Sequence, residues 1–231
     1  TINHFGLTPL PIITSLTAQN TQRLDSFEVP KDSLIEKQFD LIDEDISFNT
    51  VKIGLLGSVS QIKTISRLLN KKKSLNVILD PILMSGTQEN FSSNKMIGAM
   101  KKYLFPMSTI LTPNLEELNL LAPGLAEQEA VSSLNCSWVL VTTSDSSKVD
   151  IEHRLYHESI LKRRYKYKKL PGKFHGSGCT LSSAISALIA KGMAVEDACD
   201  EGLEYTYQCL LNAKKLGKMQ YHPIRASYKS K

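Results

Sequence analysis

The sequence predicts an α/β fold in which a mostly parallel sheet carries helices on both faces. Short apolar runs alternate along the chain with segments whose apolar residues repeat at helical spacing. The apolar runs end in polar or turn-forming residues, and no linker or internal repeat divides the chain. Such alternation is typical of strands joined by crossover helices. With 231 residues, 42% of them hydrophobic, the chain is long enough for one domain with a large core.

The first part of the chain should supply two buried strands and three helical segments. Gly6 is suited to cap the end of a helix, and Pro30 is suited to the first turn of another. Apolar residues recur at helical spacing after Pro30 and again after Gly57-Ser58. The elements expected here are a helix ending at Gly6, a buried strand over 12–16, a helix from Pro30, a strand over 51–56 and a helix over 62–69.

The remaining elements follow the same rule. Asp80-Pro81 ends one short strand, and Gly192 closes a strongly periodic helix. The elements expected are strands over 77–79, 109–111 and 138–141, hairpin or edge strands over 155–169, and helices over 96–104, 115–121, 180–189 and 195–211.

Composition excludes several classes of protein. The four cysteines form no CxxC pair and the five histidines no HExxH pattern, which argues against a disulfide framework and a structural zinc site. Such cysteine usage suits a reducing compartment. The chain contains neither a signal-peptide pattern nor an uncharged run of about 20 apolar residues. We therefore expect a soluble, cytoplasmic protein with no membrane partner.

The net charge of +5 raises the question of nucleic-acid binding. Part of the excess lies at 162–169, where Tyr165 and Tyr167 interleave basic residues. The favoured interpretation is a solvated edge strand whose lysines prevent edge-to-edge pairing, because no known nucleic-acid motif accompanies the charge. We expect no nucleic-acid partner. A positive surface also attracts phosphorylated small molecules.

The predicted strands end in groups that should lie together. In a parallel sheet, ligands bind at the carboxyl ends of the strands. The groups at these ends are Gln19-Asn20, Gly57, Asp80-Pro81, Thr112-Pro113-Asn114 and Thr142-Thr143.

The segment 175–180, His-Gly-Ser-Gly-Cys-Thr, opens directly onto a predicted helix. Two glycines allow a tight turn, and the helix N-terminus adds about half a positive charge. The combination predicts a phosphoryl-binding site in which the pKa of the Cys179 thiol is lowered. The alternative is a glycine-rich helix start with an inert cysteine. The segment is not a Walker loop, because GxxxxGK[ST] is absent.

Five motifs in this order resemble the hydroxymethylpyrimidine (phosphate) kinases of thiamin biosynthesis, a branch of the ribokinase-like superfamily. The resemblance extends from Thr1 to about residue 211. It implies a ribokinase-like three-layer αβα sandwich, a single domain over 1–231, ATP and Mg²⁺ as cofactors, and a homodimer. The motifs are Leu16-Thr17-Ala18-Gln19-Asn20-Thr21, Val51-Lys52-Ile53-Gly54-Leu55-Leu56-Gly57, Leu79-Asp80-Pro81, Thr112-Pro113-Asn114-Leu115-Glu116-Glu117 and the segment 175–180.

The resemblance implies roles at the acceptor side of the site. Gln19 corresponds to the family's glutamine that hydrogen-bonds the aminopyrimidine ring. Leu55 and Ile82 fall where apolar side chains sandwich that ring, with Leu55 in place of a usual methionine. The anion hole corresponds to Gly176, Ser177, Gly178 and Cys179, where most of the superfamily has an aspartate base at the position of Cys179.

Roles near the nucleotide also follow from the resemblance. Glu117 fits an NxxE pattern that orders water around Mg²⁺, and Asp80 lies near the metal and the phosphates. Asn114, Thr142 and Asp145 are expected to contact the nucleotide. Each assignment has a plainer alternative: Gln19 as a turn cap, Leu55 and Ile82 as core, Glu117 as an acid favoured near a helix N-terminus, and Asp80 as a strand end before proline.

The chain departs from the family pattern in two places. It begins just after the family's first strand and glycine-rich segment, and we expect the complete molecule to contain both. The family's Val-Lys-Gly-Gly is replaced by Val141-Thr142-Thr143-Ser144, which is more similar to pyridoxal kinases.

The prediction is an ATP- and Mg²⁺-dependent kinase of 4-amino-5-hydroxymethyl-2-methylpyrimidine and its monophosphate. The alternatives are a pyridoxal or pyridoxine kinase and a non-catalytic pyrimidine-binding regulator.

Overall fold

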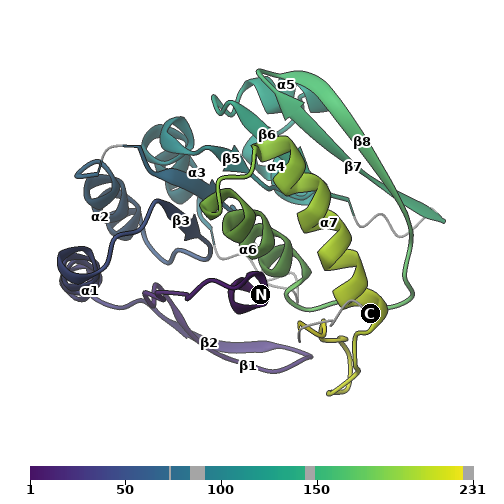
Figure 1. Cartoon of the computed structure of the whole chain (residues 1–231), viewed down its shortest axis with the longest axis horizontal. Helices are drawn as coiled ribbons and strands as arrows, with labels where there is room; N and C mark the ends of the chain where they lie inside the picture. Colours follow the sequence, from purple (N-terminus) through teal and green to yellow (C-terminus); the bar gives the residue numbers. More distant parts are fainter. Residues whose placement is uncertain (73, 84–91, 144–148, 226–231) are drawn as a thin grey trace.

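A six-stranded sheet forms the centre of the molecule (Figure 1). The computed structural model describes residues 1–72, 74–83, 92–143 and 149–225. The strands lie in the order β3-β4-β5-β6-β7-β8; the first four run parallel, and β7 and β8 are antiparallel to their neighbours. Their bounds are β3 Thr50–Ile53, β4 Asn76–Leu79, β5 Ile110–Leu111, β6 Trp138–Val141, β7 Asp150–His157 and β8 Ile160–Lys168.

Alternation along the buried strands divides the core between the two faces of the sheet. Val77 and Leu79 belong to one apolar cluster, whereas Ile78 between them belongs to the other, as the two-residue period of a strand requires. The first cluster includes residues of α1 Asp32–Asp45, α2 Val59–Leu69, α3 Asn94–Tyr103, α4 Leu115–Leu121 and α5 Glu127–Ser132. The second includes α6 Ser177–Ala190 and α7 Val195–Leu211, with the short helix η1 Ile2–Phe5 against α6. Helices therefore cover both faces, and the αβα expectation is confirmed (Figure 1).

Most predicted elements are present. The strand 138–141 and the helices 115–121 and 195–211 have the predicted bounds, and Gly6 caps η1 in the left-handed conformation. Three further elements, β2 Leu24–Glu28, α5 and the short helix η2 Phe105–Met107, were not predicted. No helix in the described part of the chain is long and apolar enough to cross a membrane.

The predicted buried strand over 12–16 is wrong. Only Leu16 of this run is in a strand, β1 Leu16–Gln19, which pairs with β2 Leu24–Glu28 in a separate antiparallel hairpin. The side chains of Ile13 and Leu16 are about half exposed. The apolar run alone did not predict burial, because this hairpin lies outside the central sheet (Figure 1).

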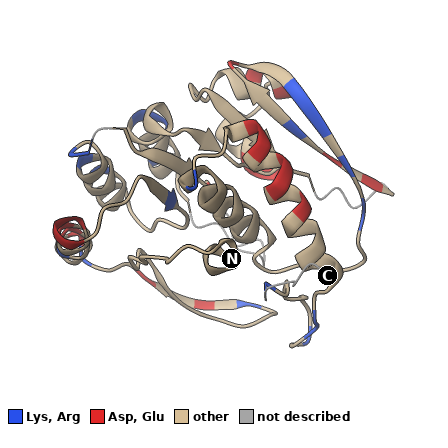
Figure 2. Cartoon of the chain, in the orientation of Figure 1, with Lys and Arg blue, Asp and Glu red and all other residues tan. Residues whose placement is uncertain are grey.

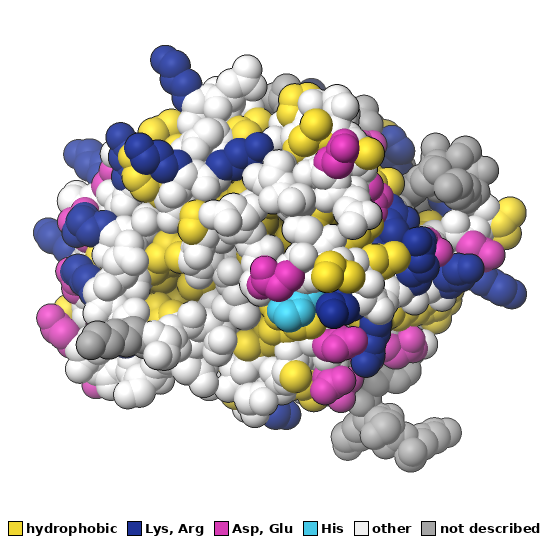
Figure 3. Space-filling model, turned by 90° about the horizontal axis from the view of Figure 1, so that it is seen from above, with side chains coloured by type: hydrophobic (Ala, Val, Ile, Leu, Met, Phe, Trp, Pro, Cys, Tyr) yellow, Lys and Arg dark blue, Asp and Glu magenta, His cyan; other side chains and the backbone are white. Residues whose placement is uncertain are grey.

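The basic segment forms the predicted hairpin, with β8 as the edge strand. Its charge is partly neutralised within the molecule: Arg163 forms ion pairs with Glu196 and Asp200 of α7, and Arg164 pairs with Glu152 of β7. The basic strand and the acidic helix are visible in Figure 2, and basic and acidic side chains lie close together on the right of the face in Figure 3. This pairing supports the edge-strand interpretation.

Candidate active site

The carboxyl ends of three neighbouring parallel strands meet at one edge of the sheet. Asp80 follows β4, Asn114 follows β5 and Thr142 follows β6. Asn114 and Thr142 form an isolated parallel bridge, and the Leu115 amide donates to the Thr142 carbonyl. The predicted convergence holds for these residues. Gln19-Asn20 lie at the end of β1, which belongs to the separate hairpin and not to this sheet, and Asp145 lies outside the described residues.

The first turn of α6 has the features of an anion site. Gly176 is its N-cap at φ 76°, a left-handed conformation that favours glycine. The first intrahelical bond runs from the Thr180 amide to the Gly176 carbonyl at 2.9 Å. The amides of Ser177, Gly178 and Cys179 precede it, so the helix gives them no partner. These residues form the start of the helix, three positions earlier than predicted, rather than a preceding loop. No acidic side chain lies in this turn.

An arginine from the C-terminal segment fixes this turn. Arg225 Nε donates to Thr180 Oγ1 at 2.7 Å, and Arg225 Nη2 donates to the Gly176 carbonyl at 3.3 Å. No carboxylate of the described residues forms an ion pair with Arg225. A cation at a helix N-terminus is unfavourable unless an anion is bound nearby.

A buried ion pair lies against the same turn. Asp80 is only 4% exposed, and its Oδ2 accepts a hydrogen bond from Ser182 Oγ at 3.0 Å. Lys52 Nζ lies 3.5 Å from the same oxygen, with its side chain 18% exposed. Ser182 also donates to the Gly178 carbonyl at 3.0 Å. Asp80 is therefore connected to β3 through Lys52 and to the first turn of α6 through Ser182.

The environment of Cys179 differs from the predicted one. Part of the residue is exposed, but burial raises the pKa of its thiol and the Asp80 carboxylate raises it further, while Lys52 and Arg225 lower it. The predicted lowering of this pKa is wrong, because burial and the neighbouring carboxylate outweigh the positive charges nearby.

Glu117 has a structural role and an unusual charge state. Its carboxylate accepts from the Asn114 amide at 2.9 Å, and its own amide donates to Asn114 Oδ1 at 2.8 Å. The pair forms a capping box at the start of α4. Burial raises the pKa of Glu117 to about 8, and Asp80 adds to the rise. The Asn114 side chain is thus engaged in capping.

The residues predicted to hold the acceptor ring come from three segments. Leu55 and Ile82 are half-buried and follow β3 and β4. A Cβ on Gly54 would lie 3.8 Å from Ile82 Cδ1, so these two loops are adjacent. Gln19 lies exposed on β1, with its Nε2 donating to Thr17 Oγ1 at 3.1 Å.

The β1–β2 hairpin rests closely on the loop after β3. A Cβ on Gly57 would come within 2.2 Å of Val29 Cγ2 and 2.9 Å of Phe27 Cζ. The absence of a side chain at Gly57 therefore lets the hairpin, which carries Gln19, approach the sheet.

Replacing Gly57 by alanine should displace the hairpin and destabilise the protein by about 1–3 kcal/mol. The KM for the acceptor should rise more than the KM for ATP, and both are measurable together with the melting temperature. Gly98→Ala on α3 is the matched control, since its Cβ would meet nothing within 4 Å and should raise stability slightly. If the KM for the acceptor is unchanged in Gly57→Ala, the hairpin has no role in acceptor binding.

Three residues of the site were not predicted. A lysine within a buried apolar strand was the available indication for Lys52, and a serine one turn after Cys179 was the indication for Ser182. Arg225 lies in the basic tail, and nothing in the local sequence indicates its contact with the α6 turn.

A helix N-terminus beside a buried carboxylate–lysine pair, at the carboxyl edge of a parallel sheet, is an arrangement suited to a phosphotransferase. The chain belongs to the phosphomethylpyrimidine kinase family, whose model matches residues 1–225. It is 30% identical over 217 residues to a hydroxymethylpyrimidine/phosphomethylpyrimidine kinase of Mycobacterium tuberculosis, covering 89% of this chain and 78% of that protein.

Two solved structures show the same architecture. The phosphomethylpyrimidine kinase of Clostridium difficile has a TM-score of 0.76 and 26% identity, covering 90% of this chain and 89% of that one. The ADP complex of Bacillus subtilis pyridoxal kinase has a TM-score of 0.86 at 21% identity, covering 98% and 89%. The ribokinase-like fold and the expected enzyme class, a phosphotransferase, are confirmed.

Proposed function

We propose that the protein is an ATP- and Mg²⁺-dependent kinase that phosphorylates 4-amino-5-hydroxymethyl-2-methylpyrimidine and then its monophosphate, as in thiamin biosynthesis. The observation that carries this proposal is the set of amides at the start of α6 that have no partner within the helix, next to Asp80 and Lys52, in a chain of this family. Phosphoryl transfer depends mainly on positioning and on stabilising charge, and this arrangement supplies both.

In the first reaction the hydroxymethyl oxygen attacks the γ-phosphorus of ATP, and ADP leaves. The amides of Ser177, Gly178 and Cys179 would stabilise the charge on the transferred phosphoryl group. The alcohol loses its proton, and we assign the acceptance of that proton to the Cys179 thiolate. Lys52 and Arg225 favour this thiolate.

The carboxylates fit a magnesium ion that is held largely by water and phosphate. Asp80 and Glu117 lie close enough for the charge of one to raise the pKa of the other. Thr112 Oγ1 is buried at the same edge and has no hydrogen-bond partner among the described residues. The described part of the chain contains no cluster of three or more metal-ligating side chains. This is compatible with Mg²⁺, because Mg²⁺ usually binds through one or two carboxylates plus substrate phosphates. When bound, the ion would neutralise phosphate charge.

The acceptor ring would lie between Leu55 and Ile82, with Gln19 of the hairpin at its amino edge. Asn114, Thr142 and Asp145 are proposed on the nucleotide side. The bridge between Asn114 and Thr142 supports a shared location for those two residues.

The test is ADP release by the purified protein with the pyrimidine, its monophosphate and pyridoxal as separate acceptors. We expect turnover with both pyrimidines and formation of the pyrimidine diphosphate. Turnover with pyridoxal alone would assign the chain to the alternative kinase. A rise in melting temperature on adding the pyrimidine, without ADP release, would indicate a non-catalytic pyrimidine-binding regulator.

We also propose a cytoplasmic homodimer. The four cysteines are free, which supports a reducing compartment. An apolar groove between the β1–β2 hairpin and α1 supports the dimer; its lining includes Ile13, Leu16 and Leu34, each about half exposed. Light scattering should give twice the mass of one chain.

A further inference from the structure

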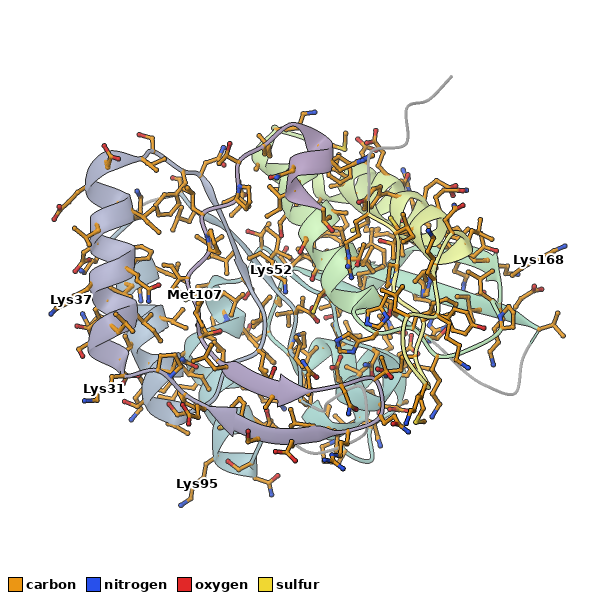
Figure 4. The ribbon with its side chains drawn as sticks, turned by 90° about the horizontal axis from the view of Figure 1, so that it is seen from below. Lys31, Lys37, Lys52, Lys95, Met107 and Lys168 are labelled. Carbon is orange, nitrogen blue, oxygen red and sulfur yellow. The ribbon has the colours of Figure 1, made fainter. Side chains whose placement is uncertain are left out.

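Lys52 is the basic residue at the centre of the site. Its side chain is 18% exposed, although lysines are rarely buried unless they are paired. Figure 4 places Lys52 in the middle of the molecule. The other labelled lysines, Lys31, Lys37, Lys95 and Lys168, lie at the periphery of the same view.

The chain makes room for the Lys52 ammonium group. A Cβ on Gly54 would lie 2.8 Å from Lys52 Nζ, so the side chain extends along β3 toward its carboxyl end. Ile82 borders the same space, and Asp80 holds the ammonium at 3.5 Å. The positive charge therefore lies between the residues proposed to hold the acceptor ring and the turn proposed to hold the transferred phosphoryl group.

The two proposed reactions differ in charge and in protons. The alcohol acceptor is neutral and must lose a proton. A phosphate monoester has its second pKa near 6, so the monophosphate acceptor is close to a dianion at neutral pH. It needs no base. It must, however, approach the negatively charged γ-phosphate of ATP close to the Asp80 carboxylate, so a cation at the acceptor would reduce this repulsion.

We propose that Lys52 binds the phosphate of the monophosphate acceptor and thereby enables the second phosphorylation. This inference rests on the proposed function. A phosphate oxygen of the acceptor attacks the γ-phosphorus, and the bond from that phosphorus to the β–γ bridging oxygen breaks. ADP leaves with the electron pair, and no proton is transferred. Lysine is suited to this role as a compact charge that binds phosphate.

The test compares two variants on two acceptors. In full-chain protein, Lys52→Met should lower kcat/KM for the monophosphate about 100-fold and for the alcohol less than about 10-fold. Cys179→Ala should show the reverse preference, since only the alcohol needs a base. Lys37→Met, at an exposed position on α1, is the matched control and should leave the ratio of the two activities unchanged.

Lys52→Arg provides a second measurement if removal of the charge beside buried Asp80 prevents folding. Arginine keeps the positive charge but shifts its position, so the KM for the monophosphate should rise several-fold more than the KM for the alcohol. Equal losses on both acceptors in either variant would overturn the role of Lys52. If the wild-type protein releases no ADP with either pyrimidine, the proposed function itself fails.

Discussion

Replacing Cys179 by alanine should lower kcat for the hydroxymethylpyrimidine by about 10²- to 10⁴-fold, the usual contribution of a general base. The KM for ATP should change much less, because the backbone amides of the α6 turn remain. Steady-state kinetics with each substrate varied in turn measure both values. Cys136→Ala, away from this turn, is a control that should keep full turnover. Near-normal turnover in Cys179→Ala would contradict the assignment.

The pH dependence of the wild-type enzyme tests the same assignment. Burial and the Asp80 carboxylate raise the pKa of the Cys179 thiol, so the thiolate is the minor form at neutral pH. Turnover of the alcohol should therefore keep rising as the pH increases above neutrality. Cys179→Asp, which carries the base found in most of the superfamily, should retain part of the turnover and lose this alkaline rise. The same alkaline rise in Cys179→Ala would assign the titration to another group.

Local patterns were sufficient for most of the fold. The strand 138–141 combines an apolar run with clear turn residues, and the helix 115–121 begins at an asparagine cap, so both bounds were predictable. The hairpin β1–β2 was not, because the burial of an apolar run depends on which elements lie next to it. Ile13 and Leu16 remain about half exposed on the structure of one chain.

The location of the candidate site was predictable from the sequence, but its electrostatics were not. The motif around Gly176 and Cys179 indicated a helix N-terminus, and Asp80 could be placed at the end of its strand. The pKa of Cys179 could not, because it depends on a carboxylate from another element. Ser182 and Asp80, which are 102 positions apart, make the hydrogen bond that joins those elements. The place of Lys52 in the site depends likewise on the direction of its side chain over Gly54.

Glu117→Gln should make the metal-free protein more stable above neutral pH while impairing catalysis. Burial raises the pKa of Glu117 from 4.5 to about 8 in the folded chain. Between these pH values the folded state holds a proton that the unfolded state has lost, so stability falls as the pH rises toward 8. The loss should be on the order of 4 kcal/mol by pH 8. Glutamine keeps a carbonyl oxygen for the Asn114 amide and never ionises, so the variant should escape this loss.

Urea denaturation at pH 6 and pH 8.5, with a chelator present, measures the difference. The free energy of unfolding should fall between these two pH values in the wild type and stay nearly constant in Glu117→Gln. If the free energy of unfolding changes with pH in the same way in both proteins, the pKa of Glu117 is not raised. Adding Mg²⁺ with ADP at pH 8.5 should then stabilise the wild type more than the variant, because only the ionised carboxylate attracts the cation. Equal stabilisation of both proteins would exclude Glu117 from the magnesium site. Greater stabilisation of the wild type would show that the buried carboxylate, which destabilises the metal-free protein at this pH, contributes to binding the ion.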